Sequence, residues 1–181
     1  LGLGQNSTDP IKIPQQVQFP ESMKILSLCG GADHTLALNK RLELYTWGRN
    51  DENQLGCLNK FDKNEVGKVG DDRNLFEATP IKVELPPGIK IRRIAAREHF
   101  SYAYSHDCAF SWGSCEGYVL GNKKEEGNEK TPFQIPKAFF KDENIGEISL
   151  GSSHVCVVLY DSIHGVVRAK FDYEVEIEKK I

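Results

Sequence analysis

The chain has 181 residues, of which 39% are hydrophobic and 27% are charged, and its formal net charge at pH 7 is −3. The longest apolar run, from Val155 to Tyr160, is far shorter than the roughly 20 residues that a membrane-spanning helix needs, so the profile is that of an ordinary soluble protein. The negative net charge argues against the broad basic surface that is expected of a nucleic-acid-binding protein.

Strand-like segments recur along the chain in a fixed order. Three segments that begin at or next to a proline alternate apolar and polar residues with the period of two typical of a half-buried strand: 9–14, 79–83 and 131–135. Further strands are predicted at 24–28, 89–94 and 145–150, then at 35–38, 101–104 and 155–159, then at 42–47 and 109–112. We expect the proline-led strand to open each unit, and one helical turn at 139–144. Four short antiparallel strands per unit are typical of a propeller blade.

One turn motif is repeated together with its surroundings. Gly31-Ala32-Asp33-His34 is followed by Trp47-Gly48 and by Gln54-Leu55-Gly56. Ala96-Arg97-Glu98-His99 is followed at the same distances by Trp112-Gly113 and by Val119-Leu120-Gly121, and Gly151-Ser152-Ser153-His154 begins a third, partial copy. A supersecondary unit repeated in this way cannot bury its apolar face alone, so the copies must stack on one another.

The spacing divides the chain into units of about 1–56, 57–121 and 122–165. The segment 57–78 is charged and has no counterpart of its length in the next unit, which predicts a loop insertion on one face of a blade. Residues 1–4 resemble the close of a preceding unit. The C-terminal extension 166–181 lacks the Trp-Gly turn, and we predict that its alternating part, 166–177, pairs outside the regular repeat. About three blades cannot close a ring, and we expect a larger chain or a partner to supply the missing blades.

The residues from Cys29 to Gly56 resemble the repeat of the RCC1 (regulator of chromosome condensation) family almost throughout, with Gly-x-x-His-Thr, Trp-Gly-x-Asn and Gln-Leu-Gly. The segment 94–121 matches more loosely, and 151–159 keeps the first half of the pattern. The resemblance covers most of 1–165 and implies an all-β fold: an RCC1-like β-propeller arc of about three four-stranded blades of a seven-bladed ring. It says less about function, because one fold hosts many activities.

The repeated residues are predicted to be structural. The histidines are expected to form hydrogen bonds inside their turns, the tryptophans to pack between blades, and the glycines to occupy turns with positive φ. These positions are His34, His99, His154, Trp47, Trp112, Gly48, Gly113, Gly56 and Gly121. No phosphate-binding loop, catalytic triad order, nucleophile elbow or zinc-protease motif is found in the sequence, so we predict a protein that is not an enzyme.

Two functions remain open. The first is a protein–protein interaction module or scaffold, in which the loops on one face of the propeller bind a protein partner within a multi-protein assembly. The second is guanine-nucleotide exchange on a Ran-like small GTPase, which the resemblance implies and for which Asp33 or Glu98 would press against the GTPase. The acidic balance, the imperfect second and third repeats and the lack of a basic tail favour the first. The predicted partner-binding residues are Asp33, Arg97, Glu98, Lys63, Asp71, Asp72 and Arg73.

The five cysteines form no Cys-x-x-Cys pair and are odd in number, which favours free thiols and an intracellular location, cytoplasmic or nuclear. No cofactor and no metal site are predicted, nor insertion into a membrane, and nucleic acid is not expected as a direct ligand. The family's plant ultraviolet photoreceptors are a poorer match, because they place tryptophan where this chain has Ala32, Arg97 and Ser152.

Overall fold

The computed structural model describes residues 2–4, 11–19, 23–57 and 76–160, and the backbone of 167–171 and 176–179. Twelve strands form three four-stranded antiparallel sheets, which we call blades 1, 2 and 3. Blade 1 contains β1 (Ile25–Gly30), β2 (His34–Asn39), β3 (Leu44–Arg49) and β4 (Phe76–Lys82). Blade 2 contains β5 (Arg93–Arg97), β6 (Phe100–Tyr104), β7 (Ala109–Ser114) and β8 (Asn128–Gln134). Blade 3 contains β9 (Asn144–Leu150), β10 (Val155–Tyr160), β11 (Val167–Phe171) and β12 (Glu176–Lys179). The predicted all-β propeller arc is therefore confirmed.

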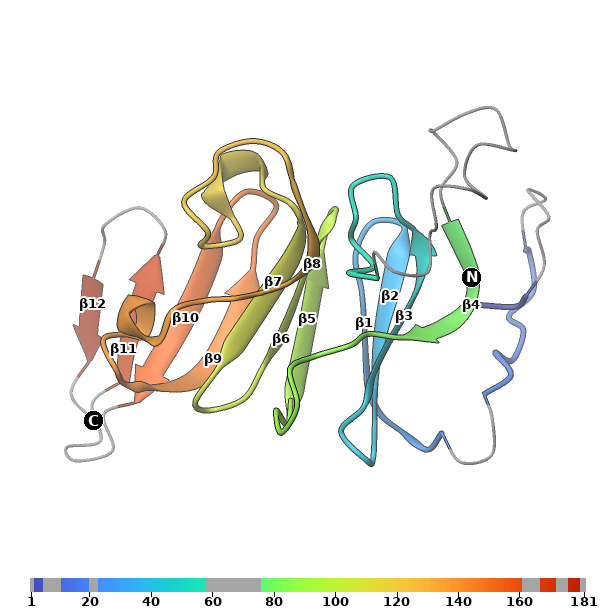
Figure 1. Cartoon of the computed structure of the whole chain (residues 1–181), viewed down its shortest axis with the longest axis horizontal. Helices are drawn as coiled ribbons and strands as arrows, with labels where there is room; N and C mark the ends of the chain where they lie inside the picture. Colours follow the sequence, from blue (N-terminus) through green and yellow to red (C-terminus); the bar gives the residue numbers. More distant parts are fainter. Residues whose placement is uncertain are drawn as a thin grey trace.

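Each blade is a meander in which every strand pairs with the next strand of the chain. The three blades follow one another across the molecule (Figure 1). The first strand of blade 2, β5, contacts both β1 and β9, so the first strands form the inner side of the arc and β4 and β8 lie at its outer side. The described helical structure is limited to two short 3₁₀ segments, Glu116–Tyr118 and Lys137–Phe140, and the described residues contain no helix that is long and apolar enough to cross a membrane.

Two apolar cores lie between neighbouring blades. Leu36, Leu38 and Leu44 of blade 1 pack with Phe110 and Trp112 of blade 2. The opposite face of blade 2 presents Phe100, Tyr102 and Tyr104 to Ile148 and Val157 of blade 3, among other residues. Every residue of β6 is consequently buried. Blade 2 is covered on both faces because the alternation of a strand sends successive side chains to opposite neighbours.

The proline-led strands close the blades instead of opening them. The strand that contains Pro80 is β4, which pairs with β3 of blade 1, and the strand that contains Pro132 is β8, which pairs with β7. Both prolines lie where the register shifts on an outermost strand, a place where a missing N–H is tolerated. Residues 11–14 form no strand, contrary to the prediction for this segment. The blades are thus shifted along the chain relative to the sequence units.

The C-terminal strands belong to the regular sheet. β11 pairs with β10 from Cys156↔Phe171 to Tyr160↔Val167, and β12 pairs with β11. The prediction that 166–177 would pair outside the repeat is therefore wrong for the described strands. Pairing needs only backbone donors and acceptors in register, so the absent Trp-Gly turn does not prevent blade 3 from completing its four strands.

The N-terminal residues cover Trp47 of blade 1. A Cβ added to Gly2 would lie 2.7 Å from Trp47 Nε1, and a Cβ added to Gly56 would lie 2.8 Å from Trp112 Nε1. The ring of Phe19 meets Trp47 edge-on, with the ring centroids 5.8 Å apart. Gly2 thus takes the place against Trp47 that Gly56 takes against Trp112, in agreement with the interpretation of residues 1–4 as the close of a repeat.

Candidate protein interface

The turns that carry three of the predicted partner-binding residues lie at one end of the blades. Because successive strands are antiparallel, the β1–β2, β5–β6 and β9–β10 turns share this end with the loops that follow β3 and β7 (Figure 1). Asp33 lies in the β1–β2 turn, Arg97 ends β5 and Glu98 lies in the β5–β6 turn. We call this end the turn face. Lys63, Asp71, Asp72 and Arg73 and most of the predicted insertion lie outside the described residues.

Asp33 lies in an ion-pair cluster at the blade 1 part of the turn face. Arg49, at the end of β3, approaches Asp33 Oδ2 with Nη1 at 3.5 Å and Asp51 Oδ2 with Nη2 at 2.5 Å. Partial burial would raise the pKa of Asp51, but hydrogen bonds from Arg49 and Gln54 lower it below its usual value. The side chains of Asp33 and Arg49 are about half exposed, so this cluster is accessible to a partner.

Arg97 and Glu98 connect blade 2 to both neighbours. Arg97 Nη2 donates to Ser152 Oγ of blade 3 at 3.3 Å, and Ser152 Oγ donates to Glu98 Oε1 at 3.2 Å. Arg97 Nε also lies 3.4 Å from Glu98 Oε1. On the other side, the backbone N–H of Ala32 in blade 1 donates to the Glu98 carbonyl at 2.9 Å. The turn face is therefore a row of opposite charges held in place across three blades.

The loop after β3 is shaped by the Asn and Gln of the repeat motif. Asn50 Oδ1 accepts from the Leu55 N–H at 3.0 Å, and Gln54 Oε1 accepts from the Glu52 N–H at 2.9 Å. The side chains of both residues are buried, so these bonds satisfy groups that would otherwise be costly to bury. The loop carries Asp51 at the turn face and directs the Gln54 carbonyl toward blade 2.

Beneath the turn face, a buried polar network joins blade 1 to blade 2. The Gln54 carbonyl accepts from Ser101 Oγ and from Trp112 Nε1, both at 2.9 Å. Ser101 Oγ lies 2.8 Å from His34 Nε2. Since Ser101 gives its one proton to Gln54, His34 must donate from Nε2, which leaves Nδ1 as an acceptor, and this buried atom has no partner among the described residues. His34 thus bonds to the next blade, whereas the sequence predicts a bond inside its own turn.

The electrostatic setting of His34 follows from this geometry. Burial is the main cause that lowers the pKa of His34 to about 4, with a smaller contribution from His99, and Asp33 opposes the shift. A second proton would have to bind at Nδ1, which has no acceptor nearby among the described residues. His34 is therefore neutral in the folded protein at neutral pH.

His99 does not occupy the position of His34, so the prediction of one shared role is wrong for it. His34 pairs with Gly48, but it is Phe100 that pairs with Gly113. The carbonyl of Asp33 accepts from the Arg49 N–H, and the carbonyl of His99 accepts from the equivalent Ser114 N–H. His99 thus corresponds to Asp33. By contrast, the Gly151 N–H donates to the His154 carbonyl just as the Gly31 N–H donates to the His34 carbonyl.

The first residue of the turn also differs between the copies. A Cβ on Gly31 would lie 2.1 Å from His34 Cε1, and a Cβ on Gly151 would lie 2.1 Å from His154 Cε1. In blade 2, Arg97 pairs with Phe100, so Arg97 stands where Gly31 stands in blade 1 and no histidine lies opposite it. Five residues, 39–43, lie between the last paired residues of β2 and β3, and four residues, 105–108, lie between those of β6 and β7, which restores the spacing to tryptophan.

No repeated motif or charge pattern in the sequence marked Arg49, Asp51, Ser101 or Ser152 as members of the site. Arg49 is the variable residue of Trp-Gly-x-Asn, a position that could have signalled an exposed side chain next to the turn. The described residues contain no group of three or more potential metal ligands.

The family model of the regulator of chromosome condensation (RCC1) repeat matches residues 1–38, 43–104 and 106–158. The chain belongs to the RCC1 repeat family. Guanine nucleotide exchange factor SRM1 of Saccharomyces cerevisiae is 30% identical over 86% of this chain and 36% of its own length, and Protein pim1 of Schizosaccharomyces pombe is 29% identical over 86% and 29%. The chain therefore spans about a third of the length of these curated relatives.

Solved structures of the RCC1 family agree with the fold. The crystal structure of Prp20p from Saccharomyces cerevisiae, whose title describes its binding to Gsp1p and histones, has a TM-score of 0.62 and 27% identity over 72% of this chain and 30% of its own. Human WBSCR16 has a TM-score of 0.64 over 85% of this chain and 34% of its own, at 18% identity, which supports the fold alone.

Proposed function

We propose that this RCC1-repeat chain is a non-enzymatic protein-binding module that contacts its partner through the turn face. The observation that carries the proposal is the row formed by Asp33, Arg49, Arg97 and Glu98, whose half-exposed charges are held in place by ion pairs within blade 1 and by bonds between blades 2 and 3. A surface fixed before binding loses less conformational entropy when a partner docks, and complementary charge gives such a surface specificity.

Guanine-nucleotide exchange on a Ran-like small GTPase is the second candidate. It is favoured by the similarity to SRM1, whose name describes this activity, and by the Prp20p structure, whose title reports Gsp1p binding. On the turn face, however, the Asp33 carboxylate is paired with Arg49, and the Glu98 carboxylate is paired with Arg97 and Ser152. An exchange factor would have to release one of these carboxylates to perturb the metal and phosphate site of a GTPase. We therefore prefer the protein-binding function to the exchange function.

The binding proposal is tested by affinity capture with matched variants. The double variant R97A/E98A removes two charges of opposite sign from the turn face, whereas K40A/E84A removes the same pair of charges from exposed positions at the other end of blade 1. Proteins retained by the wild type and by K40A/E84A, but lost with R97A/E98A, are partners at the turn face. If R97A/E98A retains every partner of the wild type while keeping its fold, the proposal is wrong.

Exchange is tested separately by the release of a fluorescent guanine nucleotide from a Ran-type GTPase. Binding without acceleration of release supports the module, and catalytic acceleration that disappears in R97A/E98A supports exchange. We further propose a cytoplasmic or nuclear location in a multi-protein assembly, consistent with an odd number of cysteines and no Cys-x-x-Cys pair in the sequence.

A further inference from the structure

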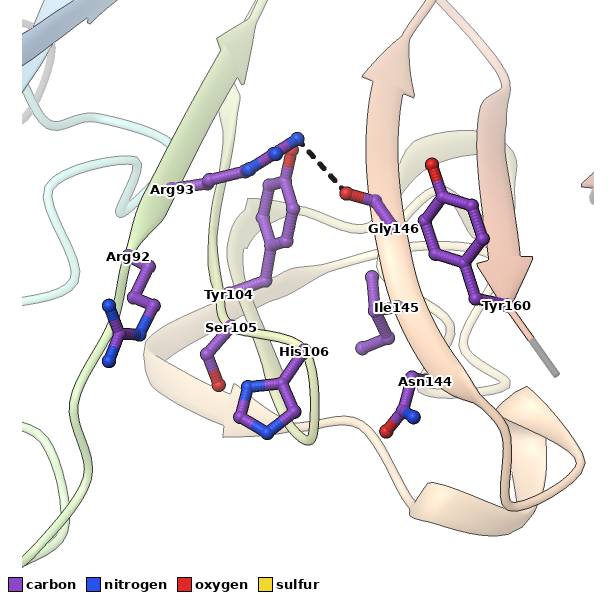
Figure 2. A pocket seen from close by; sticks show the side chains of 9 residues that line it. All are labelled: Arg92, Arg93, Tyr104, Ser105, His106, Asn144, Ile145, Gly146 and Tyr160. Atoms are coloured by element: carbon purple, nitrogen blue, oxygen red, sulfur yellow. Dashed lines mark hydrogen bonds between the residues drawn. The ribbon is translucent and has the colours of Figure 1, made fainter. Parts of the chain in front are cut away.

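A cleft between blades 2 and 3 lies at the end of the strands opposite the turn face. It has a volume of about 370 Å³ and is lined by Arg92, Arg93, Tyr104, Ser105, His106, Asn144, Ile145, Gly146 and Tyr160. These residues belong to the start of β5, the end of β6, the start of β9 and the end of β10 (Figure 2). The volume lies within the range of small-ligand pockets in proteins.

Two arginine side chains give the cleft its charge. Arg93 reaches across from β5, and its Nη1 donates to the Gly146 carbonyl of β9 at 3.0 Å (Figure 2). Neither Arg92 nor Arg93 forms an ion pair with any carboxylate of the described residues, unlike Arg49 and Arg97 at the turn face. The guanidinium groups therefore keep donors available for an anion that comes from outside.

The remaining lining supplies neutral hydrogen-bonding groups and apolar contact. His106 of the β6–β7 turn and Asn144 of β9 both line the cleft, and the side chain of Ile145 lies on the side of β9 that faces β6 (Figure 2). Tyr160 is 46% exposed and lies against Gly146, where an added Cβ would come within 2.0 Å of its ring. Arginine and tyrosine together are the residues that contribute most often to binding energy in protein interfaces.

One acid opposes the positive charge at the rim. Asp107 Oδ1 accepts from Ser105 Oγ at 2.5 Å and lies 3.8 Å from His106 Nδ1. This carboxylate weakens the local potential, and the whole chain has a net charge of −3. A nucleic acid needs several cations along its phosphates, so two arginines beside an acid do not suit it. A short carboxylate-bearing segment needs only one or two guanidinium groups.

We propose that this cleft is a binding site for an acidic peptide segment of a protein partner, with an Asp or Glu carboxylate held by Arg92 and Arg93. A neighbouring apolar side chain of the peptide packs against Ile145 and Tyr160. The site is independent of the turn face, because the two lie at opposite ends of β5 and share no residue. A module with two such surfaces can hold two partners at once.

The test uses fluorescence anisotropy of the full chain with the labelled peptide acetyl-Asp-Leu-Asp-Leu-Asp-amide, and with its Asn-for-Asp counterpart as the neutral control. R92Q removes an exposed guanidinium and is expected to weaken binding of the acidic peptide about tenfold, the value of a charge-assisted hydrogen bond. K130Q removes an equal charge from the exposed outer strand β8 and should leave the affinity unchanged. D107N, which removes the opposing carboxylate, should tighten binding.

Three results would overturn the proposal: equal affinity for the acidic and neutral peptides, an equal loss in R92Q and K130Q, or no measurable binding of the acidic peptide to the wild type. Preference for a single-stranded oligonucleotide over the acidic peptide, lost in R92Q, would also overturn it, because the cleft would then recognise phosphate. R92Q removes no side-chain hydrogen bond within the described structure, so an intact circular dichroism spectrum is expected and separates loss of binding from loss of fold.

Discussion

Acid should lower the free energy of unfolding through protonation of His34, which joins blade 1 to blade 2. In the folded chain this imidazole is neutral, with its pKa lowered to about 4 from an ordinary 6.5, mainly by burial. Between these two values the unfolded chain binds a proton that the folded chain does not, so protons favour unfolding. The contribution of the neutral imidazole to the free energy of unfolding is fully present above the pKa of the unfolded chain. It decreases as the pH falls between the two pKa values, and it stays constant below about pH 4.

The size of the effect follows from the two pKa values. From about pH 7.5 to about pH 5, proton linkage at His34 alone removes about 2 kcal/mol from the free energy of unfolding. The variant H34F removes the titrating group and places at this position the residue that blade 2 already has there, Phe100. The acid-induced loss of stability should therefore be about 2 kcal/mol smaller in H34F than in the wild type.

The assay is urea unfolding followed by circular dichroism at both pH values. H154F is the control, because it removes an exposed histidine at the matching repeat position and leaves His34 in place, so it should keep most of the acid-induced loss. Equal pH dependence in the wild type and H34F would refute the assignment of His34 as a buried neutral donor to Ser101.

Two more predictions concern the packing of blade 2. Replacing the fully buried Trp112 with Ala should lower the free energy of unfolding by roughly 3–5 kcal/mol. Replacing His106 with Ala should leave the free energy of unfolding nearly unchanged, because its side chain is 68% exposed. A small loss for the Trp112 variant in urea unfolding would contradict the burial of this side chain. Gly113→Ala should cost more than Gly88→Ala, because both glycines have positive φ but only Gly113 has an obstacle, the His99 carbonyl 2.3 Å from the added Cβ. Left-handed backbone alone costs about 1–2 kcal/mol, so equal losses in thermal unfolding would show that the turn relaxes freely.

Much of the fold could be predicted from local patterns. The alternation of apolar and polar residues gave most strands, and the Trp-Gly and His motifs gave the repeat. What local patterns could not supply is the pairing partner of each strand. The strand around Pro80 has the same period whether it opens one blade or closes another, and only its hydrogen bonds to β3 decide the matter. The pairing of β11 with β10 and β12 was missed for the same reason.

The candidate site could be predicted only in part. The exposed charges of Asp33, Arg97 and Glu98 were found because they lie in repeated turns. The role of His99 was mistaken because equal spacing to tryptophan concealed two compensating one-residue changes: His99 stands one residue earlier in its turn than His34, and one residue fewer connects β6 to β7. Contacts between blades, such as His34 with Ser101, join residues far apart in the chain, and a single sequence carries no signal for them.

The central claim, that the turn face holds the protein partner, is tested most directly by site-specific photo-crosslinking in cells. A benzoylphenylalanine at Ala32 places the probe in an exposed position of the β1–β2 turn, and the same probe at Lys40 places it in an exposed control position at the other end of blade 1, away from the cleft. We predict a specific crosslinked partner from position 32 that is absent when R97A/E98A is combined with the probe. A crosslinked partner from position 32 that persists in R97A/E98A, or no crosslinked partner from position 32 at all, would contradict the claim.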